Sequence, residues 1–456
     1  MENLNQLLEY VDCHFEEMYN DLKEICSYRS VKGDEEGLDK TRDFLIKKMK
    51  SLDFNYHLYP IESGNAIIFG EKKGEKQNTV LFYNHYDVVE EGKKENWKTQ
   101  TPFDLKIIDN KMYARGISDN KGAFLSRIHA IETILAVNKT LPINVKFILE
   151  GDEETGSPSM YKFLNENFDE FKKISKSDVC IWENGCHSID GQPWVRFGVR
   201  GSCSFELKVT TASKDVHGRM GATIPSASWR LIWALSTLKD INEKILIEGF
   251  YDSIVPPTKE DLKVLQDFPY DEENLKKLLN LKNFLLDATG EELKKRIYLE
   301  PSLSICGLEA GEMYNGPRGI VPHTATARIS FYLVAGQTPE AVFCMLKKHL
   351  IKHGFSDIEI SMKGNGNIPV KTPINIPIKN QLFNSATKVY NKPLIIELTQ
   401  LGGGPASVFK KMWTELPIVG IGPANINSNH HAPDENLRID DYKAAVKHII
   451  TLLYSY

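Results

Sequence analysis

The sequence predicts an α/β fold: a largely parallel-sheet domain, discontinuous in the chain, with an inserted βαββαβ domain. A chain of 456 residues is too long for one typical hydrophobic core. Apolar strand-like runs alternate with amphipathic helical stretches in the first and last parts of the chain. The middle part shows a different order of elements. We therefore expect one domain from residues 1–198 and 364–456, and a second from residues 199–363.

The first segment opens with two amphipathic stretches that predict helices. Short β-rich apolar runs follow, with one further helical stretch between the first two of them. The predicted helices are 4–28, 36–52 and 121–137, and the predicted strands are 79–83, 143–149 and 178–182. Strands that alternate with helices indicate a buried, mostly parallel sheet.

From about Gly198 the order of elements becomes β-α-β-β-α-β, the split βαβ arrangement. The predicted strands are 204–211, 302–307, 325–334 and 357–362, and the helices are 225–239 and 339–353. A polar, helix-prone stretch at 243–296 interrupts this order. After Gly364 the α/β pattern returns, with strands at 394–398 and 417–421 and helices at 406–412 and 440–453.

Composition and charge exclude several classes of protein. The net charge is −5, and lysine and glutamate are interspersed along the chain. The sequence therefore lacks the basic stripe that would predict a nucleic-acid partner. The first residues lack the pattern of a signal peptide. The sequence contains no run of 18 apolar residues, so we expect no membrane span. Seven cysteines without a CxxC pair are typical of reduced thiols. We expect a cytoplasmic protein with a small-molecule partner.

Histidines and carboxylates follow the predicted strands of the parallel sheet. Ligands of such sheets bind beyond the carboxyl ends of the strands, so these side chains should meet at one edge. They are His85, Asp87, Asp119, Glu150, Asp152, Glu153, Glu154, Glu183, His430 and His431. A single exposed carboxylate is usually only solvated. Solvation of single side chains does not explain why histidines and carboxylates occur together in five loops at the ends of the strands.

Two imidazoles with several carboxylates form a ligand set that zinc, manganese or cobalt accepts. One bridging carboxylate would create a dinuclear site. In His85-Tyr86-Asp87 the alternate residues share one face of a strand. Asp87 can therefore hold the ring N–H of His85 and fix its tautomer.

Four motifs, in order, resemble those of one metallopeptidase family. They are NHYDVV at 84–89, GISDNKG at 116–122, EGDEETGS at 150–157 and NHHAPDE at 429–435. The sequence is similar to the zinc metallopeptidase family of carnosinase-type dipeptidases, aminoacylases, acetylornithine deacetylase, succinyl-diaminopimelate desuccinylase and glutamate carboxypeptidase. The resemblance spans nearly the whole chain.

The resemblance implies two divalent ions per chain, with zinc favoured over cobalt or manganese. One ion would bind His85, Glu183 and the bridging Asp119, and the other would bind Glu154, His431 and Asp119. Glu153 would be the general base, taking a proton from water and returning it to the leaving amine. His430 would be a bystander or would support the ligands from behind.

The inserted domain resembles the family's lid and dimerisation domain, which implies a homodimer. The segment DVHG at 215–218 resembles the lid segment whose histidine reaches the partner subunit's active site. His217 would then help to stabilise the oxyanion across the dimer. A polar loop histidine is the alternative explanation.

Substrate identity is the open question. Glu183 stands where peptidases of the family tend to carry aspartate and deacylases glutamate. Tyr332 and Gln400 stand where carnosinase-like members carry arginines that hold a substrate carboxylate, and Arg318 is a possible replacement. The run Gly402-Gly403-Gly404 could donate backbone N–H groups to an anionic substrate group, although a plain tight turn explains it equally well.

These residues favour deacylation of an N-acyl amino acid or amine. A dipeptidase or carboxypeptidase of the same family is the alternative, and a non-catalytic metal-binding protein is the remote one.

Overall fold

The structure is a computed structural model, and it describes residues 2–311 and 319–456. The chain divides into two compact units. The first unit consists of the chain up to Gly198 together with Lys371–Gln400 and Pro405–Tyr456. The second unit consists of Val199–Val370 and Leu401–Gly404. The second unit thus extends past the predicted end at residue 363. Its last strand, β16 (Glu359–Asn367), continues five residues beyond the predicted strand end at 362.

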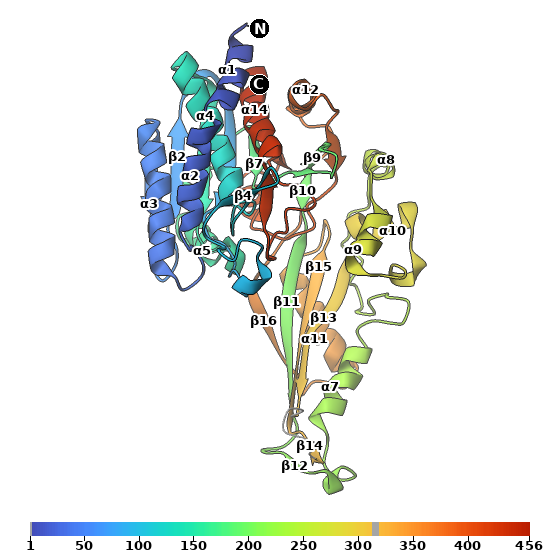
Figure 1. Ribbon diagram of the computed structural model, residues 1–456. Coiled ribbons are helices and arrows are strands. Elements are labelled where there is room, and N and C mark those ends of the chain that lie inside the picture. The colour runs from blue at the N-terminus through green and yellow to red at the C-terminus, as the bar shows by residue number, and fades with distance from the viewer. Residues whose placement is uncertain (1, 312–318) are drawn as a thin grey trace. The chain divides into compact units, whose positions relative to one another are not determined.

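A largely parallel sheet forms the centre of the first unit (Figure 1). Its strands lie in the order β1-β2-β6-β3-β7-β19-β9-β18, with β8 paired to β9. Their bounds are β1 (Asn55–Tyr59), β2 (Ile67–Lys72), β3 (Gly74–His85), β6 (Leu141–Glu150), β7 (Val179–Trp182), β8 (Cys186–His187), β9 (Pro193–Arg196), β18 (Ile395–Glu397) and β19 (Ile418–Gly420). The pairs β3·β6, β3·β7, β7·β19 and β9·β18 are parallel. Every residue of β6 is buried, as expected for a strand covered on both faces.

Helices cover this sheet. They are α1 (Glu2–Cys13), α2 (Phe15–Ser27), α3 (Glu35–Ser51), α4 (Lys121–Asn138), α5 (Pro158–Glu166), α6 (Phe168–Ile174), α12 (Lys379–Tyr390), α13 (Ser407–Met412) and α14 (Ile439–Ser455). A separate small sheet has the order β20 (Asn436–Arg438), β5 (Lys111–Tyr113), β4 (Lys106–Ile108). Figure 1 shows α1, α4 and α14 close together, and α14 contacts both of the others.

Two sequence predictions for this unit need correction. The single helix predicted at 4–28 is two helices that break at His14, whose φ of −107° and ψ of 19° are not helical. The ring Nδ1 of His14 lies 3.0 Å from the main-chain oxygen of Tyr10, so its side chain bonds backward onto α1. The strands β1 and β2 were missed. β1 is a partly exposed edge strand, so it lacks a continuous apolar run.

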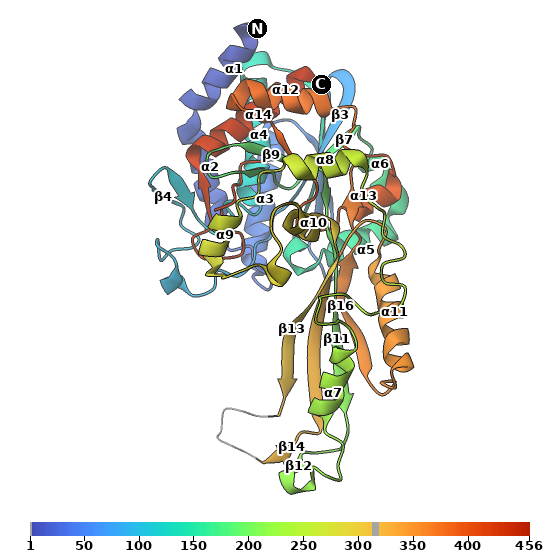
Figure 2. The same ribbon diagram turned by 90° about the vertical axis from the view of Figure 1, so that its right-hand side faces the viewer.

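The second unit is an α+β sandwich, and its βαββαβ order confirms the predicted fold class (Figure 2). The antiparallel sheet has the order β13 (Ser302–Ala310), β15 (Thr324–Leu333), β11 (Gly201–Thr210), β16. Alternate residues of β11 and β15 form one core with α7 (Ala227–Ser236) and α11 (Pro339–Lys352). Both helices therefore cover the same face of the sheet.

Short elements complete the second unit. The helix-prone stretch contains α8 (Lys259–Asp267), α9 (Glu272–Leu279) and α10 (Gly290–Leu299), and a short ladder joins β12 (Val216–His217) to β14 (Ile320–Val321). β10 (Gly198–Val199) and β17 (Val370–Lys371) lie where the chain passes between the units. Among the described residues, no helix combines the length and apolar character that crossing a bilayer requires.

Candidate metal centre

The candidate site lies at the carboxyl ends of three neighbouring strands of the first unit. β3 lies between β6 and β7, and all three run parallel. The register pairs His85, the last residue of β3, with Glu150, the last residue of β6. Glu183 directly follows β7, and Glu153 begins the short 3₁₀ turn η2 (Glu153–Thr155) after β6. The sheet itself therefore delivers an imidazole and several carboxylates to one edge.

The carboxylate of Asp119 lies between two histidines. Its Oδ1 is 3.1 Å from Nε2 of His85, and its Oδ2 is 3.3 Å from Nε2 of His431. The same His431 nitrogen lies 3.0 Å from Oε2 of Glu154. One carboxylate thus directs one oxygen at His85 and the other at His431, and ligand atoms of His85, Asp119 and Glu154 all lie within 4.8 Å of one another. This is the arrangement that a bridging ligand between two cations requires.

Among the buried carboxylate oxygens at this edge that lack hydrogen-bond partners in the described part of the chain, two belong to predicted ligands. They are Oε1 of Glu154 and Oε1 of Glu183. Desolvation raises the pKa of Glu183 to about 7, although the nearby His85 opposes the rise. Desolvation also raises the pKa of Glu154. Buried, unpaired carboxylates are costly unless a cation compensates them, so the residues present fit bound metal ions.

The side chain of His431 keeps 55% of its surface exposed, in contrast to the buried His85. An exposed ligand on one side leaves room for a water molecule or a substrate. Catalytic metal sites differ from structural ones in keeping such an open position.

Asp87 supports this arrangement from behind. Nδ1 of His85 lies 3.1 Å from the main-chain oxygen of Asp87 and 3.3 Å from its Oδ1. The Asp87 carboxylate also accepts hydrogen bonds from the main-chain N–H groups of Glu153 and Glu154. Burial lowers the pKa of His85, but its bonds to Asp119 and Asp87 outweigh burial and raise it well above its usual range. Asp87 therefore orients both the histidine and the glutamate turn.

The loop that carries Asp119 is tightly folded. A Cβ on Gly122 would lie 2.0 Å from the main-chain oxygen of Ile117, so only glycine fits there. Gly116 adopts a φ of +81°, a conformation that favours glycine. The neighbouring His430 places Nε2 2.7 Å from Oγ of Ser118 and Nδ1 3.9 Å from Oδ2 of Asp119. His430 thus contacts Ser118 and the Asp119 carboxylate, whereas His431 contacts both Asp119 and Glu154.

Sequence reasoning missed Arg127, a buried side chain of α4. Its guanidinium donates to the main-chain oxygens of Tyr83 at 2.8 Å and Glu183 at 2.6 Å. It also donates to the side chain of Asn84. Arg127 therefore ties the ends of β3 and β7 together beneath the site. No pattern around it distinguishes it from an arginine on the polar side of a helix.

The other predicted residues are placed differently. His217, Tyr332 and Gly402-Gly403-Gly404 belong to the second unit, so the metal group of the first unit is described without them. Gln400 belongs to the first unit, where its Nε2 donates to Oε2 of Glu183 at 3.3 Å. Arg318 lies outside the described residues. Gln400 thus contacts a predicted ligand rather than presenting a free amide.

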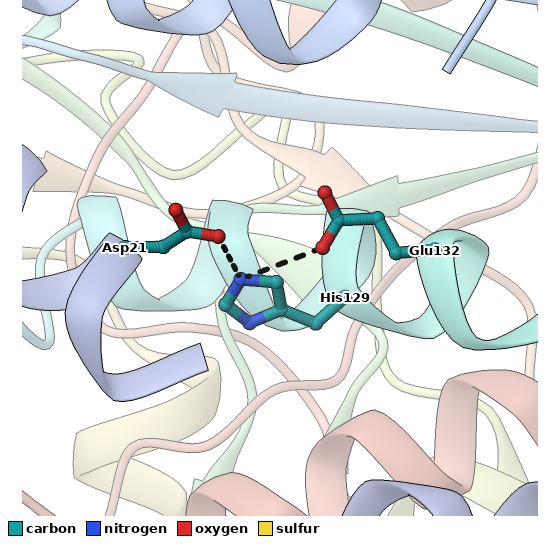
Figure 3. Close-up of side chains that lie close together, drawn as sticks. All are labelled: Asp21, His129 and Glu132. Atoms are coloured by element: carbon teal, nitrogen blue, oxygen red, sulfur yellow. Dashed lines mark hydrogen bonds and ion pairs between the residues drawn. The ribbon is translucent and has the colours of Figure 1, made fainter. Parts of the chain in front are cut away.

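A second group of possible metal ligands lies among α2, α3 and α4 (Figure 3). Nε2 of His129 is 3.1 Å from Oδ2 of Asp21 and 3.8 Å from Oε2 of Glu132. Nζ of Lys48 donates to both carboxylates. Desolvation opposes the change, but bonds from His129 and Lys48 lower the pKa of Asp21. The lysine ammonium already supplies the cation here, so we interpret this group as an ion-pair network between helices.

Comparison with known proteins places the fold and the site in one class. The sequence matches the peptidase family M20/M25/M40 over residues 81–455. The chain therefore belongs to this family of metallopeptidases, and it is a hydrolase that acts on peptide bonds.

Individual relatives agree with this assignment. The chain is 30% identical to a Beta-Ala-His dipeptidase of Rattus norvegicus over 383 residues, which cover 79% of this chain and 77% of that protein. It is 29% identical to a Cys-Gly metallodipeptidase of Schizosaccharomyces pombe, covering 77% of this chain and 76% of that protein. The crystal structure of an M20 family metallo-carboxypeptidase from Sulfolobus solfataricus matches with a TM-score of 0.89 and 33% identity, covering 96% and 98% of the two chains.

These relatives correct the substrate preference drawn from the sequence. They are named as peptidases, which favours the dipeptidase alternative over the deacylase interpretation. The deacylase interpretation relied on Tyr332 and Gln400 because neither side chain brings a charge to a substrate carboxylate. In the structure the amide of Gln400 contacts Glu183, and the guanidinium carbon of Arg200 lies 6.0 Å from the Tyr332 ring centroid. Neither residue therefore argues for deacylation.

Proposed function

We propose that the protein is a dinuclear, zinc-dependent dipeptidase. The observation that carries the proposal is the carboxylate of Asp119, whose two oxygens face His85 on one side and His431 on the other. Glu154 and Glu183 add two carboxylates at the same sheet edge, each with one buried oxygen that lacks a hydrogen-bond partner in the described part of the chain. The membership of the chain in the M20 family gives the reaction class, hydrolysis of a peptide bond.

In this proposal His85, Glu183 and Asp119 hold one ion, and Glu154, His431 and Asp119 hold the other. The bound ions would supply Lewis acidity toward the scissile carbonyl and would lower the pKa of a water molecule. Glu153 would accept a proton from water and return it to the leaving amine. Asp87 holds the His85 tautomer through the Nδ1 contact.

A dipeptide and an N-acyl amino acid share a free carboxylate, and the free α-amino group of the dipeptide separates the two substrate classes. A charge-assisted hydrogen bond to a free terminus contributes roughly 1.5–3 kcal/mol, which corresponds to about 10–100-fold in kcat/KM. We therefore expect the zinc-loaded protein to hydrolyse an unmodified dipeptide at least ~10-fold more efficiently than the same dipeptide with an acetylated amine or an amidated carboxyl. Steady-state kinetics on such matched substrates measures this directly.

N-acetyl amino acids are the matched control for this experiment. Efficient cleavage of the N-acetyl amino acid, with dipeptides left intact, would restore the deacylase interpretation. If only one of the two blocked dipeptides loses activity, the result identifies which terminus the site binds.

We further propose that the protein is a homodimer formed through the second unit. Apolar side chains of α7 and β13 are exposed on the helix-covered face of the sheet, among them Trp229 at 57% and Leu308 at 57%. Trp229 also stacks on the exposed Trp233. β13 is an edge strand, paired on one side with β15. An apolar edge strand is a template for another strand, and a two-fold pairing with a second copy buries both at once.

Replacing Leu308 by Lys tests this interface. The side chain is exposed in the single chain, so we expect the fold to tolerate the change. A charge at the centre of an apolar interface should raise the dimer Kd by roughly 30-fold or more, the effect of losing about 2 kcal/mol. Sedimentation analysis over a concentration series measures the change.

Leu278→Lys is the matched control, because Leu278 is a 70% exposed leucine on α9 of the same unit. An unchanged mass for Leu308→Lys, or an equal effect of both variants, would contradict the proposed interface.

The resemblance also implies that His217 acts across the dimer. Mixed His217→Ala and Glu153→Gln chains should then regain activity that neither has alone. A cytosolic location stays a prediction from the sequence.

A further inference from the structure

Glu435 is the last residue of the motif that contains His431. Its side chain is completely buried. Oε1 accepts hydrogen bonds from the main-chain N–H groups of Ser118 and Asp119, each at 2.8 Å. Oε2 accepts from the main-chain N–H of Gly116 at 2.9 Å and from Nη1 of Arg115 at 2.7 Å. A single carboxylate therefore receives four donors, all from the segment that ends at Asp119.

These bonds fix the backbone of the Asp119 loop from one side. The amide of Asn184 holds the same loop from another, because its Nδ2 donates to the main-chain oxygen of Ser118 at 2.7 Å. The peptide group between Ser118 and Asp119 is thus held at both its N–H and its C=O. Restraining this peptide sets the position of the Asp119 Cα and so the direction of its carboxylate.

A carboxylate suits this position better than any neutral side chain. All four partners of Glu435 are donors, and an ionised carboxylate offers only acceptors. A glutamine would turn its NH₂ group toward N–H donors on one side and leave them unpaired. Arg115 supplies the compensating positive charge, and both side chains are buried. The chain therefore contains a buried ion pair at the point where the loop needs several acceptors.

We propose that Glu435 is a positioning residue that holds Asp119 in its bridging orientation. It also couples the Asp119 loop to the segment that carries His431, because Glu435 lies four positions after His431. Groups that orient metal ligands without touching the metal typically change metal affinity about 10–100-fold when they are lost. The inference rests on the proposed metal centre and adds a residue that does not contact the metal.

The test measures metal binding in the absence of substrate. The metal-free wild-type protein and the Glu435→Gln variant are titrated with Zn²⁺ against a chelating competitor, and with Co²⁺ while the visible absorption of the bound ion is recorded. We expect the variant to bind Zn²⁺ about 10–100-fold more weakly. We also expect its Co²⁺ spectrum to change, because the ligand geometry changes.

Glu397→Gln is the matched control for loss of stability alone. Glu397 is also a buried carboxylate of the first unit, and its Oε2 lies 2.8 Å from Nε of Arg196. This variant should lower the melting temperature of the metal-free protein while Zn²⁺ affinity stays within about two-fold of wild type, because the lost ion pair joins the neighbouring strands β18 and β9. Glu435→Asp, which keeps the charge on a shorter side chain, should give an intermediate affinity.

The outcomes separate the two proposals. Wild-type protein that binds no divalent ion would contradict the metal centre itself. Wild-type protein that binds metal while Glu435→Gln binds it equally well, with an unchanged Co²⁺ spectrum, would contradict the positioning role alone. If Glu435→Gln fails to fold, Glu435→Asp decides, and wild-type affinity in that variant would overturn the inference.

Discussion

Replacing Glu153 by Gln is expected to lower kcat by at least ~10²-fold while the bound metal stays in place, which is the usual effect of removing a positioned general base. Glu153 begins the 3₁₀ turn after β6 and precedes the proposed ligand Glu154. Desolvation raises the pKa of Glu153 well above its ordinary value, and the nearby Glu183 raises it further. An amide at this position keeps the size of the side chain but cannot accept a proton.

Glu154→Gln is the matched control, since it makes the same chemical change one residue away. Its Oε2 contacts His431, and its other oxygen has no partner in the described part of the chain. We expect this variant to lose metal, whereas Glu153→Gln should keep it. Elemental analysis combined with single-turnover kinetics distinguishes the two. A Glu153→Gln enzyme within a few-fold of wild type would show that the roles of the pair are misassigned.

Replacing Asp119 by Ala should remove more metal than replacing any other ligand. In the proposed site Asp119 would contact both ions, so its loss would weaken two sites at once. We expect metal content to fall from close to two ions per chain to below one, with activity lost. A strong chelator should abolish wild-type activity, and zinc, manganese or cobalt should restore it. None of these metals should restore the Asp119→Ala variant.

Asp21→Asn is the control for this experiment. Asp21 lies in the other His–carboxylate group, where the Lys48 ammonium already supplies the cation. We expect that variant to keep its metal content and to lose stability only. Metal loss from Asp21→Asn would make the second group a metal site, and activity that is indifferent to chelation would contradict the mechanism as a whole.

The relation between sequence and structure is clearest at the individual ligands. His85, Asp119, Glu154, Glu183 and His431 were selected because each follows a predicted strand or resembles a family motif. Parallel strands end at the same edge of their sheet, so strand prediction was sufficient to bring most of these residues together. The assignment of their roles remains a prediction that the experiments above address.

Errors arose where the local pattern does not determine the structure. The break at His14 falls within a continuous amphipathic pattern, and β1 is too exposed to show an apolar run. The deacylase preference came from Glu183 and from the uncharged side chains at positions 332 and 400. The contacts of those side chains, with Arg200 and Glu183, depend on segments far away in the chain.

By itself, the sequence determined the α/β class and the inserted βαββαβ unit, and it predicted the ligand types and the contact between Asp87 and His85, because hydrophobic periodicity and short motifs are local properties. Only the tertiary structure revealed the more distant groups that hold the predicted ligands in place. Arg127 beneath two strand ends and Glu435 around the Asp119 loop make their bonds across 44 and 316 residues of sequence. A buried polar group must find its partners wherever the folded chain places them. No local pattern records that choice, since the partners are mostly backbone groups that every residue carries.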